Sequence, residues 1–113
     1  MQFIHSMDSA KIIWEDSFEG NLSSIITITT TNPKACNIQD NNGNTPLVFA
    51  CVGDHLEVIT ALIEKGGNIH IKNRAGVNAL YFAKGSQRRS QILKLWEKHT
   101  PEAKALATGN TVV

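Results

Sequence analysis

The sequence repeats itself at an interval of 33 residues, and this feature constrains the fold more than any other. A shift by 33 positions places the middle of the chain on its C-terminal part and gives at least eight identities, most of them apolar residues or glycine. Periods of 20–50 residues are typical of stacked repeats rather than of a conventional globule. The coincident residues are Ile38 and Ile71, Gly43 and Gly76, Leu47 and Leu80, Phe49-Ala50 and Phe82-Ala83, Leu62 and Leu95, and Glu64-Lys65 and Glu97-Lys98.

Each period reads as two short helices followed by an extended loop. In "NTPLVFAC" a helix begins, because Thr45 can accept a hydrogen bond from an orphan backbone N–H and Pro46 is tolerated at the first helical position. Apolar residues then recur with helical spacing over residues 56–65, and Gly66-Gly67 ends this second helix. The alternating isoleucines of "NIHIKNRAG" favour a short turn or hairpin.

Residues 40–72, "DNNGNTPLVFACVGDHLEVITALIEKGGNIHIK", resemble the ankyrin repeat. Val48 and Tyr81 stand where ankyrin repeats often have a histidine, whose side chain forms a hydrogen bond between neighbouring units. Asp54 replaces a glycine, at a position where a positive φ is expected. The pattern D-x-x-G-x-T-P-L-H-x-A-A-x-x-G-H-x-E-V-V is matched at Asp40, Gly43, Thr45, Pro46, Leu47, Ala50, His55, Glu57 and Val58.

The flanking units fit the pattern less closely. The last unit has Asn78-Ala79 in place of Thr-Pro, and the first has Gly20-Asn21-Leu22 where Gly-His is typical. Taken alone, "IITITTT" (residues 25–31) favours a strand, because β-branched residues suit sheets. The repeat register instead places it in the second helix of the first unit, and we predict a helix.

The resemblance implies an all-α fold, an ankyrin-repeat solenoid of stacked helix-turn-helix units with short β-turn or hairpin fingers. We expect a flexible N-terminal extension (1–7) and a C-terminal tail (100–113). The tail is expected to fray, although Thr111-Val112-Val113 also resembles the carboxy-terminal ligands of PDZ domains. We expect one domain over residues 8–99, units at about 8–39, 40–72 and 73–99, and helices at 9–18, 22–31, 46–52, 56–65, 79–85 and 89–98.

Charge is unevenly spread, although the net charge is +1. From Asp8 to Glu64 there are eight acids against two bases, and from Lys72 to Lys98 seven bases against one acid. This polarity could steer an acidic partner or a nucleic acid. Solvated faces of opposite sign are the simpler interpretation.

The residues predict no catalytic, cofactor or metal site, and therefore no enzyme. Asp54, His55 and Glu57 are interpreted as the start of the second helix, where an aspartate caps and a glutamate favours the positive end. Cys51 falls in a small-residue core position, which predicts a buried, inert thiol. Cys36 has no obvious base beside it. The four histidines stand at least fifteen residues apart, which matches no common metal-ligand spacing.

The compartment is expected to be the reducing cytoplasm, because the two cysteines form no CxxC pair or disulfide scaffold. A nuclear setting, or secretion into a host cell, stays open. The sequence has no apolar stretch long enough to span a bilayer.

Proteins that resemble this family are chiefly protein-binding scaffolds and adaptors. We expect a monomer that binds another protein, possessing an acidic segment, through a concave surface of fingers and inner helices, with no membrane and no cofactor. The alternative is nucleic-acid or acidic-partner binding through the basic residues Arg74, Lys84, Arg88, Arg89, Lys94 and Lys98, although no aromatic residue is interleaved for base stacking. The resemblance implies partner contacts at Phe18, Glu19, Gln39, Asn41, Asn42, Asn44, Val52, Lys72, Arg74, Ala75, Val77 and Ser86.

Overall fold

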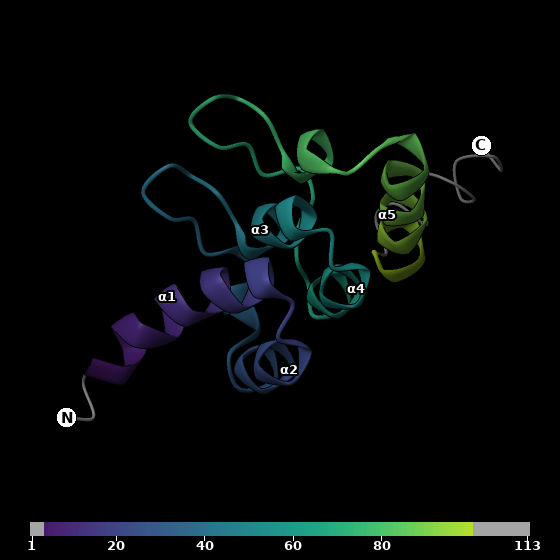
Figure 1. The fold of residues 1–113 in the computed structure, drawn as a ribbon. Helices are drawn as coiled ribbons and strands as arrows, with labels where there is room; N and C mark the ends of the chain where they lie inside the picture. Colours follow the sequence, from purple (N-terminus) through teal and green to yellow (C-terminus); the bar gives the residue numbers. More distant parts are fainter. Residues whose placement is uncertain (1–3, 101–113) are drawn as a thin grey trace, which may run out of the picture.

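Helices stacked in two rows make up the computed structural model, which describes residues 4–100 (Figure 1). Within this range there is no β-strand, and no helix is long and apolar enough to cross a membrane. The expectations for residues 101–113, including the PDZ-like end, lie outside the described residues. The elements are α1 (Ile4–Glu19), α2 (Leu22–Thr31), the 3-10 helix η1 (Pro33–Asn37), α3 (Pro46–Gly53), α4 (Leu56–Glu64), the 3-10 helix η2 (Ala79–Phe82) and α5 (Ser86–His99).

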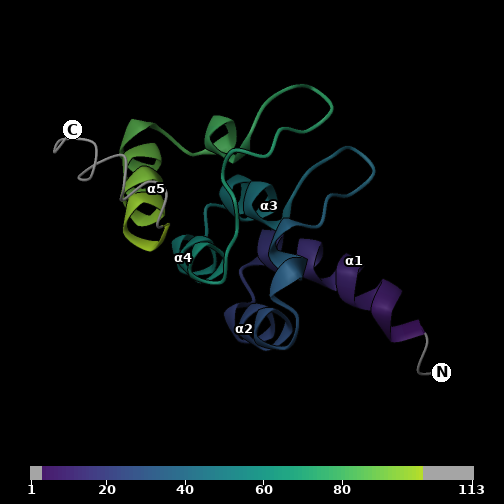
Figure 2. The same ribbon diagram turned by 180° about the vertical axis from the view of Figure 1, so that it is seen from behind.

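The inner row contains α1, α3 and η2, and the outer row contains α2, α4 and α5. Each inner element packs on the next inner element and each outer helix on the next outer helix. The view from behind shows the same order, with two long loops projecting from the inner row (Figure 2). The chain is therefore a short solenoid of three helical units.

The core follows the repeat register. Ile25, Ile59 and Ile92 occupy the same position in the three outer helices, and all three side chains are fully buried. Leu47 and Leu62 are also fully buried between the units, as the sequence predicts. The outer row is thus held together by equivalent apolar residues from successive units.

The stretch "IITITTT" is helical, which confirms the prediction from register over the prediction from propensity. Its threonines satisfy their hydroxyls within the helix, because Thr27, Thr29 and Thr31 each donate to the carbonyl oxygen four residues earlier. Ile25 is buried in the core that α2 shares with α4. Tertiary packing therefore overrides the strand preference of β-branched residues.

The predicted α-helix at residues 79–85 is wrong. Only the 3-10 turn η2 forms there, and α5 begins at Ser86 rather than at residue 89. Asn78 caps the turn by accepting from Leu80 N–H at 3.0 Å, but Gly85 has φ 95 and the backbone leaves helical geometry before it. The backbone is already extended at Ala83, where ψ is 140, so η2 ends after one turn and does not continue into an α-helix.

At the other end, α1 begins at Ile4. Residues 4–7, which the sequence analysis assigned to an extension, are therefore part of a helix. The remaining helices lie within about a turn of their predicted positions.

Candidate binding surface

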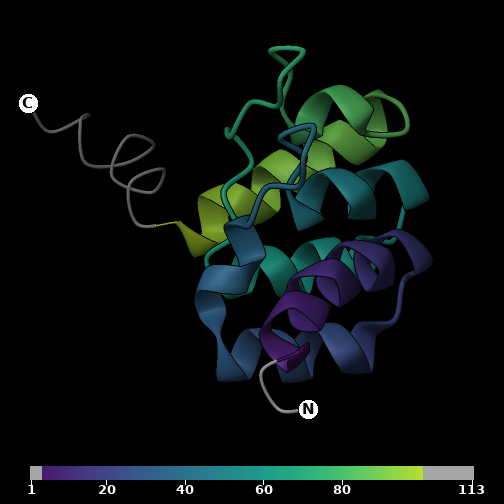
Figure 3. The ribbon, with the colours of Figure 1, turned by 90° about the vertical axis from the view of Figure 1, so that its left-hand side faces the viewer.

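Two loops project from the same side of the stack, and we call them the first finger (residues 38–45) and the second finger (residues 71–78). Figure 3 shows both fingers rising beyond the inner row. In the first finger, one Asp40 carboxylate oxygen accepts hydrogen bonds from the backbone N–H groups of Asn42 and Asn44, both at 2.9 Å. A side chain thus closes the turn that the backbone alone would leave unsatisfied.

The second finger repeats this turn with an asparagine. Asn73 Oδ1 accepts from the N–H groups of Ala75 at 2.9 Å and Val77 at 3.2 Å. Asn73 lies 33 residues after Asp40, and in both side chains the Oδ1 atom is the hydrogen-bond acceptor. Asn73 is not among the predicted site residues, although an Asn or Asp three residues before a glycine at the repeat interval is a usable signal.

The glycines of the two turns share a backbone conformation but not an environment. Gly43 has φ 81 and Gly76 has φ 82. A Cβ on Gly43 would lie 3.0 Å from Arg74 N and Asn73 Cα, whereas a Cβ on Gly76 would meet no atom within 4 Å. The first finger is therefore packed tightly against the second, while the far side of the second finger is open.

Hydrogen bonds join the two fingers along their length. A backbone N–H, an asparagine amide and a glutamine amide each cross from one finger to the other. Two of these three hydrogen bonds include a backbone group, so they fix the two fingers relative to each other. The pairs, donor first, are Arg74 N–H with Asn42 O (2.9 Å), Asn73 Nδ2 with Asn44 Oδ1 (2.8 Å) and Gln39 Nε2 with Lys72 O (3.2 Å).

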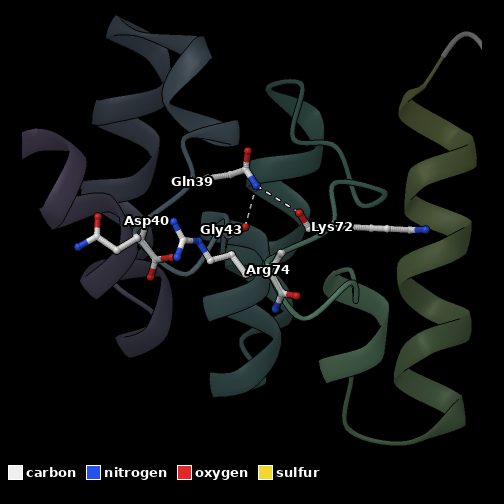
Figure 4. Close-up of a pocket in the computed structure, with 7 residues that line it drawn as sticks. Gln39, Asp40, Gly43, Lys72 and Arg74 are labelled. Carbon is white, nitrogen blue, oxygen red and sulfur yellow. Dashed lines mark hydrogen bonds between the residues drawn. The ribbon is translucent and has the colours of Figure 1, made fainter.

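An open groove of about 520 Å³ lies along the two fingers. Figure 4 shows Gln39 reaching across it, with its amide donating to Gly43 O at 2.9 Å as well as to the second finger. Arg74 points toward Asp40, whereas the Lys72 amine points away, toward α5. The groove is lined by Gln39, Asp40, Asn41, Gly43, Lys72, Asn73 and Arg74.

The structure brings the predicted finger residues together. Two of them, Asn44 and Val77, are half-buried, and the amides of Gln39 and Asn44 take part in the ties between fingers. The others offer their side chains to solvent. The exposed finger residues are Gln39, Asn41, Asn42, Lys72, Arg74 and Ala75.

The residues predicted for the inner helices form a separate group, but one of them, Ser86, lies on the outer helix α5 and not on an inner helix. Phe18 and Glu19 end α1, Val52 lies in the last turn of α3, and Ser86 begins α5. The eight residues of α3 separate this group from the fingers by roughly 10 Å, at about 1.5 Å per residue. Phe18 is 49% exposed and is the large apolar side chain of this group. One ligand would have to run the length of α3 to contact both groups.

The repeated units, the stacked rows and the paired fingers agree with comparison to known proteins. A family model described as ankyrin repeats, in three copies, matches residues 15–107. The chain belongs to the ankyrin-repeat family. Ankyrin repeats are generally protein–protein interaction modules and are typically non-catalytic.

A rice protein (Oryza sativa subsp. japonica) shares part of this ankyrin domain. It is described as probable E3 ubiquitin-protein ligase XBOS33, and the two chains are 42% identical over 40 residues. The match covers 35% of this chain and 8% of the rice protein. The similarity thus extends over little more than one repeat.

The ankyrin domain replaces the family's bridging histidine differently in each unit. Trp14 occupies this position in the first unit, and its Nε1 donates to Ile38 O, beside the first finger, at 2.8 Å. Val48 occupies it in the second unit, is 2% exposed and has no polar group to donate. Tyr81 occupies it in the third unit and is 68% exposed. In the first unit a tryptophan at this position therefore donates a hydrogen bond to the backbone of the first finger.

Asp54 has a different role from the predicted one. It was expected to cap α4, but it follows α3 with φ 58, and His55 is the residue that precedes α4. The positive φ expected at this position is confirmed. The Asp54 carboxylate instead accepts from Arg88 Nε at 2.7 Å, so that it joins the second unit to the third. Glu57 lies in the first turn of α4, as predicted.

A second tie joins the first unit to the second at the equivalent position. His55 Nε2 lies 2.9 Å from Phe18 O, and His55 and Arg88 are 33 residues apart. Gly53 allows this close approach, because a Cβ there would lie 2.3 Å from Phe18 O. Asp54 and His55 therefore both join neighbouring units of the stack.

Ionisable groups of the ankyrin domain show shifts with structural causes. The hydrogen bond from Arg88 lowers the pKa of Asp54 and, reciprocally, raises that of Arg88. Burial raises the pKa of Cys36 to about 11 and that of Cys51 to about 12. Both thiols are free and buried, which leaves them protonated and poor nucleophiles at neutral pH. Among the residues that the structure describes, no group of three or more His, Cys, Asp or Glu could hold a metal ion.

Proposed function

We propose that this ankyrin domain is a non-catalytic adaptor that binds a partner protein through its fingers and the adjoining inner helices. The observation that carries the proposal is the set of hydrogen bonds between the two fingers. They fix the backbone of both fingers while the side chains of Asn41, Asn42 and Arg74 remain exposed. A preorganised surface loses little conformational entropy on binding.

The chemistry of the second finger favours an acidic partner segment. Lys72 and Arg74 are exposed there, and the third unit adds the exposed bases Lys84, Arg89 and Lys94. Within the described residues, no salt bridge engages these five side chains. An acidic segment would be drawn to this end of the surface, and its association would slow as salt rises, because exposed charges mainly steer encounter.

The buried free cysteines suit a reducing compartment, and we place the protein in the cytoplasm. Oxidising compartments favour paired cysteines in small domains, and Cys36 and Cys51 are not paired.

The proposal is tested by capturing partners from a lysate with the full chain and identifying them by mass spectrometry. Binding of an identified partner is then compared between the wild type and Asn42→Ala and Arg74→Ala variants. We expect each variant to weaken binding by about fivefold or more, the usual effect of removing an anchor residue. Thr60→Ala and Glu64→Ala, on the outer row, are the controls and should bind as the wild type does.

Two results would contradict the proposal. One is loss of binding in the outer-row variants while the finger variants bind normally. The other is tight binding of nonspecific DNA or RNA with a steep salt dependence, abolished by substitution of Lys84, Arg89 and Lys94, which would establish the nucleic-acid alternative.

A further inference from the structure

The exposed fraction of equivalent side chains changes from unit to unit along the stack. This change indicates whether a position of the repeat faces the preceding or the following unit. Trp14, Val48 and Tyr81 share one position of the repeat. Trp14 is half-buried and bonded to Ile38, at the start of the finger that leads into the following unit, and Val48 is 2% exposed in α3, which packs on η2. Tyr81 is 68% exposed. This position therefore faces the following unit, and Tyr81 marks the end of the stack where no described unit follows.

A second position shows the opposite trend. Ile12, Pro46 and Ala79 are equivalent, and Pro46 and Ala79 are almost fully buried. Ile12 is 40% exposed on α1, which no described unit precedes. Each end of the stack thus exposes an apolar side chain at a position that the interior of the stack buries. Terminal units of repeat proteins usually carry polar outer faces instead.

Charges of opposite sign accompany these two apolar residues. Glu15 follows Ile12 by three residues on α1 and is exposed. Lys84 follows Tyr81 by three residues and is also exposed, at the position that the buried Cys51 occupies in the second unit. The surrounding residues extend the contrast, because the first two units are acidic and the third is basic.

The basic end also offers a recess. A cavity of about 360 Å³ lies beside Tyr81 and is bordered by Val77, Leu80 and Arg89. Its apolar residues and its arginine complement an isoleucine with a nearby carboxylate. The α1 end of another copy presents that combination, because Ile12 and Glu15 are both exposed there.

We propose that the two ends of the stack bind each other between copies of this chain. The α1 end of one copy, with Ile12 and Glu15, packs head to tail on the η2 end of a second copy, with Tyr81 and Lys84. The surfaces differ, so the contact is heterologous and extends into short open stacks rather than closing as a symmetric dimer. The chain is a monomer at low concentration, as the sequence predicts, and associates as the concentration rises.

The test is sedimentation velocity of the full chain over a range of concentrations, with charge-reversed variants. Glu15→Lys and Lys84→Glu should each suppress association of the variant alone, by about threefold to tenfold in the dissociation constant, because like charges then meet. An equimolar mixture of the two variants should associate again. It should form stacks in which the two variants alternate, because both junctions between unlike variants then join opposite charges, whereas both junctions between like variants join like charges.

Tyr81→Ala and Leu93→Ala are the matched apolar substitutions. Leu93 is 36% exposed on α5, at the position equivalent to Thr60, and does not line the recess beside Tyr81. Tyr81→Ala should weaken association by about tenfold or more, as loss of a central aromatic contact does, and Leu93→Ala should leave it unchanged. Far-UV circular dichroism verifies that each variant is folded.

Three results would overturn the proposal. The first is a wild-type sedimentation coefficient that does not rise with concentration. The second is a mixture of the charge-reversed variants that associates no more than either variant alone. The third is an equal effect of Tyr81→Ala and Leu93→Ala.

Discussion

Replacing Gly43 and Gly76 by alanine separates the packing between the fingers from the conformation of their turns. The two glycines occupy the same position of the repeat and have nearly the same φ, 81 and 82. Only Gly43 contacts the neighbouring finger, so the difference between the two substitutions measures that contact.

The expected magnitudes follow from the surroundings of each glycine. Holding an L-residue in the left-handed region costs roughly 1–2 kcal/mol. The reduced entropy of the unfolded chain offsets about 0.4–1 kcal/mol of this, so that Gly76→Ala should lower the free energy of unfolding by about 1 kcal/mol. Gly43→Ala adds the overlap of its Cβ with Arg74 N and Asn73 Cα, each 3.0 Å away. Overpacking of this kind adds about 1–3 kcal/mol.

Urea denaturation followed by the fluorescence of Trp14 and Trp96 measures both free energies. Gly43→Ala should be less stable than Gly76→Ala by about 1–3 kcal/mol, with no change in the slope against urea concentration. Equal losses for the two variants would refute the inference that the fingers pack tightly. A larger loss for Gly76→Ala would show that the open face is instead on the first finger.

Three further predictions concern the core and the contacts between units. Leu47→Ala and Leu62→Ala should each lower the free energy of unfolding by about 2–5 kcal/mol, because both side chains are fully buried; unchanged denaturation midpoints would show that the core lies elsewhere. The hydrogen bond from Arg88 lowers the pKa of Asp54 in the folded protein below its ordinary value of 3.8. The ion pair therefore stabilises the folded protein above pH 3.8, and this stabilisation is lost as the pH falls through the lowered pKa of Asp54. Arg88→Gln should therefore lose less stability on acidification below 3.8 than the wild type does, and parallel losses in thermal melts would contradict this. Burial raises the pKa of Cys51 to about 12, so a thiol reagent at neutral pH should label it slowly until urea unfolds the chain, and labelling at the unfolded rate in native buffer would contradict its burial.

The repeat register predicted most of the helical architecture. It placed "IITITTT" in a helix against its local propensity, because Ile25 had to occupy the core position of Ile59 and Ile92. It failed at residues 79–85, where the backbone becomes extended at Ala83 and only a 3-10 turn forms. Local structure can therefore change while the register of the repeat is kept.

The fingers illustrate what the sequence could and could not provide. Register correctly assembled the finger residues on one surface, but it did not distinguish side chains that hold the fingers from those that remain free. The side chains of Gln39 and Asn44 form hydrogen bonds with the second finger. Asn42 instead accepts through its backbone carbonyl oxygen and leaves its side chain exposed. Asp54 likewise joins two units through Arg88, a contact 34 residues along the chain that periodicity alone does not reveal. Such contacts depend on side-chain geometry, which a pattern of residue types leaves undetermined.

The most direct test of the binding surface is an NMR titration of the isotope-labelled chain with a captured partner. Backbone amide shifts should change mainly in residues 39–44 and 72–77, and added salt should slow the association of an acidic partner segment. Shift changes concentrated on the outward face of α2 and α4, including Thr60 and Glu64, with the finger amides unaffected, would contradict the assignment of the fingers as the binding surface.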